Sequence, residues 1–207
     1  GPDQGWVNNW DSSNIVEIEN NDDSVGPFEL GFDFSFYGES FSQFWINANG
    51  MISFNEISDG FWNNSVGIPD DEAANYAIYP WWDDLMPNGA NYSQYIRYLT
   101  NNSDSLVVTW NNTDHYNGAN YGGPFSFQIV CEANGKITLN YGDMADSDQD
   151  SDSGTIGIRG SASETLVIQH MDQSVSQRTV KIRLPYWTKL SQLSGIVAPG
   201  TTDRIPL

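Results

Sequence analysis

The stretch from Phe28 to Phe36 constrains the fold of this chain more than any other. In the run Phe28-Glu29-Leu30-Gly31-Phe32-Asp33-Phe34-Ser35-Phe36, apolar residues occupy every even position, and acidic residues, glycine or serine occupy the odd ones. Side chains of a β-strand point alternately to its two faces. This period of two therefore predicts a strand with one buried face.

Short apolar runs separated by polar turns continue along the chain. The strand candidates are residues 15–19, 28–36, 44–46, 51–54, 77–82, 95–99, 106–110, 125–131, 136–141, 155–159, 165–169 and 179–184. Asn49-Gly50 between two of them is a hairpin signal, because both residues tolerate positive φ. Roughly eleven short strands with little helix predict an all-β fold, an antiparallel, jelly-roll-like β-sandwich.

Length and composition are those of one domain with a large core. The chain has 207 residues, of which 39% are hydrophobic and 14% aromatic, and such a chain buries a core without help from disulfides. Cys131 is the single cysteine. It therefore excludes an internal disulfide and a cysteine-based zinc site. Because it lies in the apolar run 127–131, we expect a buried, inert thiol. Trp45, Trp81 and Trp110 are expected in or beside the core.

The charge is strongly negative. The chain has 27 acidic and 8 basic residues, a net charge of −19. Such a field repels nucleic acid and anionic membranes, so neither is expected as a partner. No apolar run is long enough for a membrane span. The charge favours cations, with Ca²⁺ the obvious one outside the cell. It also fits a salt-rich habitat, where surface aspartates keep a protein hydrated, and both explanations stay open.

Several motifs carry a resemblance to a known family. They are Leu30-Gly31-Phe32-Asp33-Phe34, Ile46-Asn47-Ala48-Asn49-Gly50-Met51-Ile52, Tyr79-Pro80-Trp81-Trp82-Asp83-Asp84-Leu85, Val107-Val108-Thr109-Trp110 and Thr155-Ile156-Gly157-Ile158. Residues 1–185 resemble a β-sandwich module of large secreted, multidomain bacterial proteins, and the module is loosely similar to the nidogen-like extracellular domain. The resemblance implies a secreted or cell-surface, non-catalytic module, often beside a peptidase or among Ig-like repeats. It implies no established ligand.

The C-terminal residues change character after Leu184-Pro185. Residues 186–207 resemble the opening strands of Ig-like repeats in bacterial surface proteins, with Trp187 followed by Ser191 and then by a Ser-Gly and a Pro-Gly pair. They are either the start of a second module or a last edge strand of the first sandwich. The sequence leaves both alternatives open.

The most suggestive polar cluster is an aspartate ladder at Asp146, Asp148, Asp150 and Asp152. Alternating aspartates place hard oxygen ligands in one loop, as Ca²⁺ requires. The ladder is not an EF-hand, because Ser151 stands at the glycine position and no glutamate closes the loop. It predicts a Ca²⁺ site, and a solvated acidic loop is the alternative.

Two further acidic pairs are candidate metal or ligand sites. Asp83-Asp84 follows the aromatic run 79–82, and Asp22-Asp23 follows two asparagines. Either pair could bind a metal, or its carboxylates could accept backbone N–H groups in a turn. We favour the turn, and the acidic sites could also converge in space.

Aromatic residues beside polar ones mark two loops as a candidate sugar-binding surface, since rings stack on sugars while amides and carboxylates bind hydroxyls. The candidate ligand-binding residues are Trp62, Asp114, His115, Tyr116, Asn117 and Tyr121. Loops on a rigid scaffold commonly carry recognition. The alternative is that these rings fold back over the core. Exposed rings clustered on one face would favour binding.

No enzyme motif is present. The chain has two histidines and no G-x-S-x-G, H-E-x-x-H or P-loop pattern, so we expect no catalysis. We expect a binding or adhesion module of a larger surface protein, with a glycan or surface protein and neighbouring domains as partners. The alternative is a structural spacer or peptidase-associated module without a ligand of its own.

Overall fold

Thirteen β-strands and no α-helix make up the described part of the computed structural model, which comprises residues 5–8, 12–68, 73–87, 95–116, 123–144, 153–170, 175 and 177–184. The strands are β1 (Asn14–Val16), β2 (Ser24–Phe36), β3 (Glu39–Asn47), β4 (Met51–Ser53), β5 (Ala77–Trp82), β6 (Leu85–Met86), β7 (Tyr95–Thr100), β8 (Ser105–His115), β9 (Phe125–Glu132), β10 (Lys136–Met144), β11 (Thr155–Arg159), β12 (Thr165–His170) and β13 (Thr179–Arg183). Within these ranges, no helix has the length and apolarity that a membrane crossing requires.

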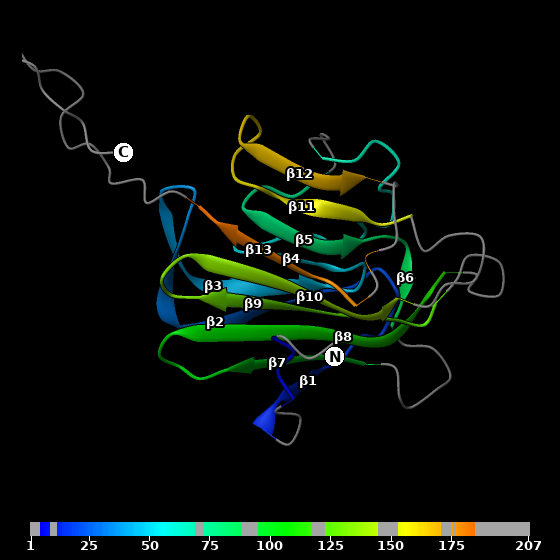
Figure 1. The fold of residues 1–207 in the computed structure, drawn as a ribbon, viewed down its shortest axis with the longest axis horizontal. Coiled ribbons are helices and arrows are strands. Elements are labelled where there is room, and N and C mark those ends of the chain that lie inside the picture. The colour runs from blue at the N-terminus through cyan, green and yellow to red at the C-terminus, as the bar shows by residue number, and fades with distance from the viewer. Residues whose placement is uncertain are drawn as a thin grey trace, which may run out of the picture.

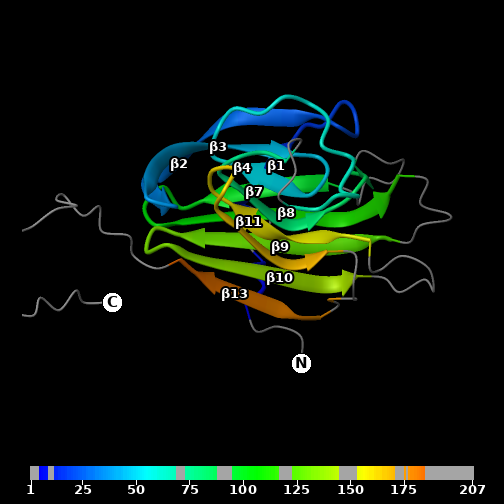
Figure 2. The ribbon, with the colours of Figure 1, turned by 90° about the horizontal axis from the view of Figure 1, so that it is seen from above.

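The strands form two antiparallel sheets that face each other. A seven-stranded sheet has the order β1-β7-β8-β9-β10-β13, with β6 paired to β8, and a six-stranded sheet has the order β12-β11-β5-β4-β3-β2. The sheets lie one behind the other in Figure 1, and Figure 2 shows β2 and β3 of the six-stranded sheet on one side of the domain and β10 and β13 of the seven-stranded sheet on the other. The β-sandwich prediction is confirmed. The strand β6 is an addition, because two residues are too few for a periodic signal.

Alternation in β2 builds one wall of the core. Leu30, Phe34 and Phe36 are fully buried, whereas Glu29 and Asp33 are not. Large aromatic side chains from both sheets complete the interior, and the fully buried ones include Phe44, Trp81, Trp110, Phe125 and Phe127. Apolar burial of this extent is the main stabilising contribution to such a domain.

The turn between β3 and β4 confirms the hairpin prediction. Asn47 pairs with Met51 across the hairpin, and Gly50 adopts a φ of 81°. A Cβ atom at Gly50 would lie 1.9 Å from the carbonyl oxygen of Trp81. Only glycine therefore fits this position, both for its φ and for the close approach of the neighbouring strand.

Gly5 and Val7 lie against the outer face of the seven-stranded sheet. Gln128 accepts a hydrogen bond of 3.0 Å from the Val7 amide and donates one of 3.1 Å to the Val7 carbonyl. Asn140 donates to the Gly5 carbonyl over 2.8 Å. On the inner face, Cys131 is fully buried as expected, and burial raises the pKa of its thiol.

Candidate functional site

Four chain segments surround an open pocket at one end of the sandwich, where β5 and β8 end and β6 lies (right-hand side of Figure 1). We call it the Trp62 pocket. It is lined by Glu19, Asn20, Asn21, Asp22, Trp62, Asp84 and Tyr116. Its volume is about 510 Å³, which is within the roughly 300–1,000 Å³ typical of small-molecule sites.

Trp62 is an exposed ring on a loop that is held in place. Its side chain is 53% exposed. On one side, Trp82 Nε1 donates a hydrogen bond of 2.6 Å to the Phe61 carbonyl. On the other, the buried Asn64 side chain donates to the carbonyls of Trp82 and Ser153, at 2.7 and 2.9 Å. A fixed loop presents the indole with little ordering cost on binding.

Tyr116 is the second exposed ring, and its backbone is fixed by two neighbours. The side chain is 47% exposed. Its amide donates to the Asp84 carbonyl over 2.8 Å, and its carbonyl accepts from Nδ1 of His115 over 2.5 Å. Nε2 of His115 lies 3.3 Å from the Asp83 carboxylate. Because both partners are acceptors, a doubly protonated His115 ring satisfies both of them.

The charge state of His115 follows from these contacts. Burial lowers the pKa of His115, but the hydrogen bond and charge of Asp83, the Tyr116 carbonyl and the charge of Asp84 outweigh it, so the pKa is raised. His115 therefore lies behind the pocket and joins the Tyr116 carbonyl to the Asp83 carboxylate. His115 is not among the residues that line the pocket, so it would affect a ligand there only through its neighbours.

The two residues of the Asp83-Asp84 pair have different roles: Asp83 stabilises the local structure, and Asp84 lines the Trp62 pocket. The Asp83 side chain is buried and accepts hydrogen bonds from Ser153 Oγ and, at 2.9 Å, from the Asp84 amide. Asp84 is half-buried and lines the pocket. Among the described residues, none donates a hydrogen bond to its carboxylate.

The Asp22-Asp23 pair is divided in the same way. The Asp23 carboxylate accepts the backbone amides of Glu19 and Asn20, each at 2.8 Å, and so closes a tight turn. Asp22 lines the pocket and accepts a hydrogen bond of 2.9 Å from Asn49. The two aspartates that line the pocket are therefore different from the two that hold its turns.

A buried asparagine pair beneath the pocket joins its segments. The Asn49 side chain is fully buried, donates to Asp22 and to the Gly60 carbonyl, and accepts the Leu85 amide at 2.8 Å. Asn47 donates to Ser24 Oγ at 2.9 Å and also contacts the Gly60 carbonyl. Sequence reasoning assigned these asparagines to a hairpin turn only. The spacing Asn47-x-Asn49 could have indicated this role, because side chains two residues apart can lie on the same side of a turn.

Burial and neighbouring charges perturb Asp84. Burial raises the pKa of its carboxyl to about 6, the charges of Asp22 and Asp83 add to this effect, and the charge of His115 opposes it. The carboxylate is therefore held among like charges in an incompletely solvated position.

The other predicted site residues fall into two groups. Asp114 pairs with Met86 across β8 and β6, and it does not line the pocket. The remaining ones lie outside the described residues: Asn117, Tyr121, Asp146, Asp148, Asp150 and Asp152. Among the described residues, no three Asp, Glu, His or Cys side chains come together as metal ligands.

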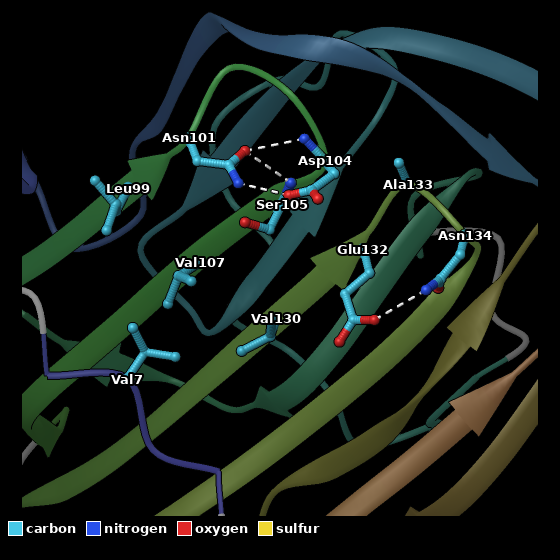
Figure 3. Close-up of a pocket in the computed structure, with 10 residues that line it drawn as sticks. All are labelled: Val7, Leu99, Asn101, Asp104, Ser105, Val107, Val130, Glu132, Ala133 and Asn134. Carbon is cyan, nitrogen blue, oxygen red and sulfur yellow. Dashed lines mark hydrogen bonds between the residues drawn. The ribbon is translucent and has the colours of Figure 1, made fainter.

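A second pocket, of about 610 Å³, lies at the opposite end of β8 on the outer face of the seven-stranded sheet (Figure 3). We call it the Val107 pocket. Its lining includes the cross-strand neighbours Leu99, Val107 and Val130 and the acidic residues Asp104 and Glu132. Sequence reasoning missed it. The signal was a run of apolar residues, 106–108, that places apolar side chains on both faces of one strand.

Comparison with known proteins gives one match. A family model described as nidogen-related matches residues 4–189, which is most of the 207-residue chain. No curated protein and no solved structure matches the chain. The family match extends through the whole sandwich and the Trp62 pocket. The chain therefore belongs to the nidogen-related family.

Proposed function

We propose that this domain is a non-catalytic binding and adhesion module of a larger surface protein, and that the Trp62 pocket holds its glycan ligand. One observation carries the proposal. Two exposed rings, Trp62 and Tyr116, line one pocket together with carboxylates and amides, on segments that hydrogen bonds hold in place. Rings stack on sugar faces, and the polar groups bind hydroxyls. Clustered, exposed rings are what the binding interpretation requires.

The architecture supports this use of the pocket. Its residues come from the β1–β2, β4–β5 and β5–β6 connections and from the end of β8. All four segments are anchored on the sandwich through Asn49, His115 or Asn64. Loops on a rigid scaffold form recognition sites without rearranging the core.

Ca²⁺ is a second part of the proposal. We propose that the aspartate ladder at residues 146–152 binds Ca²⁺ and stabilises the domain. Support comes from the alternating aspartates and from the net charge of −19, which a bound cation would partly offset.

The test is a glycan array and a polysaccharide pull-down, run in Ca²⁺ and repeated in EDTA. The wild-type chain is compared with Trp62→Ala, Tyr116→Ala and a control, Leu166→Ala, which removes an exposed apolar side chain from β12. Binding lost in both pocket variants and kept in the control would support the proposal. Binding by neither the wild type nor the control would contradict it, and would favour a spacer or peptidase-associated module.

A further inference from the structure

The charged residues of the Trp62 pocket are all acidic. Glu19, Asp22 and Asp84 line it, and no Lys, Arg or His is among the lining residues. Mutual repulsion contributes to the raised pKa of Asp84, which burial dominates. Bringing a positive charge into the pocket would relieve this repulsion. An anionic sugar would increase it.

The pocket also contains acceptors for which the described part of the chain supplies no donor. Asn21 lines the pocket, and its side-chain oxygen is buried and has no hydrogen-bond partner among the described residues. The Asp84 carboxylate receives no hydrogen bond from any described residue. A buried acceptor left without a donor is unfavourable, because folding has removed its hydrogen bonds to water. A ligand that supplies several N–H donors would satisfy both groups.

The aromatic rings identify the kind of cation. Trp62 and Tyr116 present large exposed surfaces to the pocket. A ring face attracts an organic ammonium group through its quadrupole, whereas Ca²⁺ and Mg²⁺ take oxygen ligands, which ring carbons do not supply. Rings, carboxylates and unmatched acceptors together favour a protonated amine over a metal ion.

We propose that the Trp62 pocket binds an amino sugar, with its protonated amine at Asp84 and Asp22 and its ring against Trp62. This inference rests on the proposed function and specifies the ligand class of the same site. The amine supplies three N–H donors, which the Asp84 and Asp22 carboxylates and the Asn21 side-chain oxygen can accept. Asn20 and Asn21 also line the pocket. Because the Asn20 amide donates a hydrogen bond of 3.2 Å to the Asp23 carboxylate, we assign the contact with sugar hydroxyls to the Asn21 amide. The open pocket and the flat rings suit a sugar ring better than a narrow alkyl amine.

The test is a calorimetric titration of the 207-residue chain, near neutral pH, with two hexasaccharides that differ in charge: the hexamer of glucosamine and the hexamer of N-acetylglucosamine. We expect the amine form to bind at least about tenfold more tightly, as an ion pair with ring contacts allows. Asp84→Asn should remove most of this preference, and Trp62→Ala should weaken binding of both hexamers. The charge-matched control is Asp33→Asn, an exposed position in β2 outside the pocket.

The outcomes separate this inference from the proposed function. Equal binding of both hexamers, lost in Trp62→Ala, would overturn the amine assignment and leave a glycan site in the pocket. A third ligand, the hexamer of lysine, tests general attraction to the acidic chain. If it binds the wild type as tightly as the glucosamine hexamer does, and binds Asp84→Asn equally well, the amino-sugar assignment is overturned. Binding of neither hexamer would also overturn it, and the glycan array then tests the proposed function separately.

Discussion

The side-chain amide of Asn49 donates a hydrogen bond of 2.9 Å to the carboxylate of Asp22, across 27 positions of sequence. The same side chain holds the Gly60 carbonyl and the Leu85 amide. One buried residue at the tip of a hairpin therefore sets the relative positions of three segments around the Trp62 pocket. This makes Asn49 a positioning residue that has no contact with solvent.

Replacing Asn49 with alanine should destabilise the domain by about 2–4 kcal/mol, because buried backbone groups lose their partners. Urea unfolding measures the change. Asn55→Ala is the matched control, since Asn55 is exposed beside the same hairpin, and it should stay within about 0.5 kcal/mol of the wild type. Equal unfolding midpoints for the two variants would show that the Asn49 contacts do not hold the site.

Trp62 and Trp110 should respond oppositely to truncation. Trp62→Ala should leave stability within about 0.5 kcal/mol, because its ring is 53% exposed, while retention on the glycan ligand is lost. Trp110→Ala should cost about 3–5 kcal/mol, since that ring is fully buried in the core. Thermal unfolding and polysaccharide pull-down distinguish the two effects. A large loss of stability in Trp62→Ala would make its ring structural.

The ionisation of the Asp84 carboxyl should make the stability of the domain depend on pH. Its pKa is raised from 3.8 to about 6 on folding, so the folded state favours the protonated carboxyl. The associated stabilisation is present below about pH 4 and is lost as the pH rises through about 6. The raised pKa of His115 acts in the same direction.

Asp84→Asn should therefore melt at a higher temperature than the wild type at about pH 8, and at the same temperature near pH 4. Melting curves across this range, with Asp33→Asn as the control, measure the difference. If the wild type and Asp84→Asn stay parallel at every pH, the Asp84 carboxyl has no raised pKa.

Removal of Ca²⁺ tests the acidic ladder. EDTA should lower the melting temperature of the wild type, and Ca²⁺ added in excess should restore it. The double variant Asp148→Asn with Asp150→Asn should melt at one temperature in both buffers. A wild-type melting curve that EDTA leaves unchanged would contradict Ca²⁺ binding by the ladder.

The sandwich could be predicted because its signals are local. The alternation at residues 28–36 and the Asn49-Gly50 turn depend on neighbours in sequence, and both correspond to the structure. The strand β6 lacked such a signal because it has two residues, and its pairing with β8 is not local.

The site could be predicted only in part, because it is assembled from distant segments. Loop composition marked Trp62 and Tyr116 as candidate ligand-binding rings but left open whether they fold back over the core, and both are exposed in the structure. It could not divide each aspartate pair into one carboxylate that closes a turn and one that lines the pocket. That division depends on which backbone amides the fold brings near, as Asp23 and Asp83 show.

The most direct test of the Trp62 pocket follows the indole N–H signals in ¹H–¹⁵N spectra during titration with the glucosamine hexamer. We expect the indole signal that is absent from the spectrum of Trp62→Phe to shift most. The indole signals of the buried Trp81 and Trp110 should stay in place. Shifts confined to the signals of Leu99, Val107 and Val130 would place the binding site in the Val107 pocket. An unshifted Trp62 indole signal would contradict ligand binding in the Trp62 pocket.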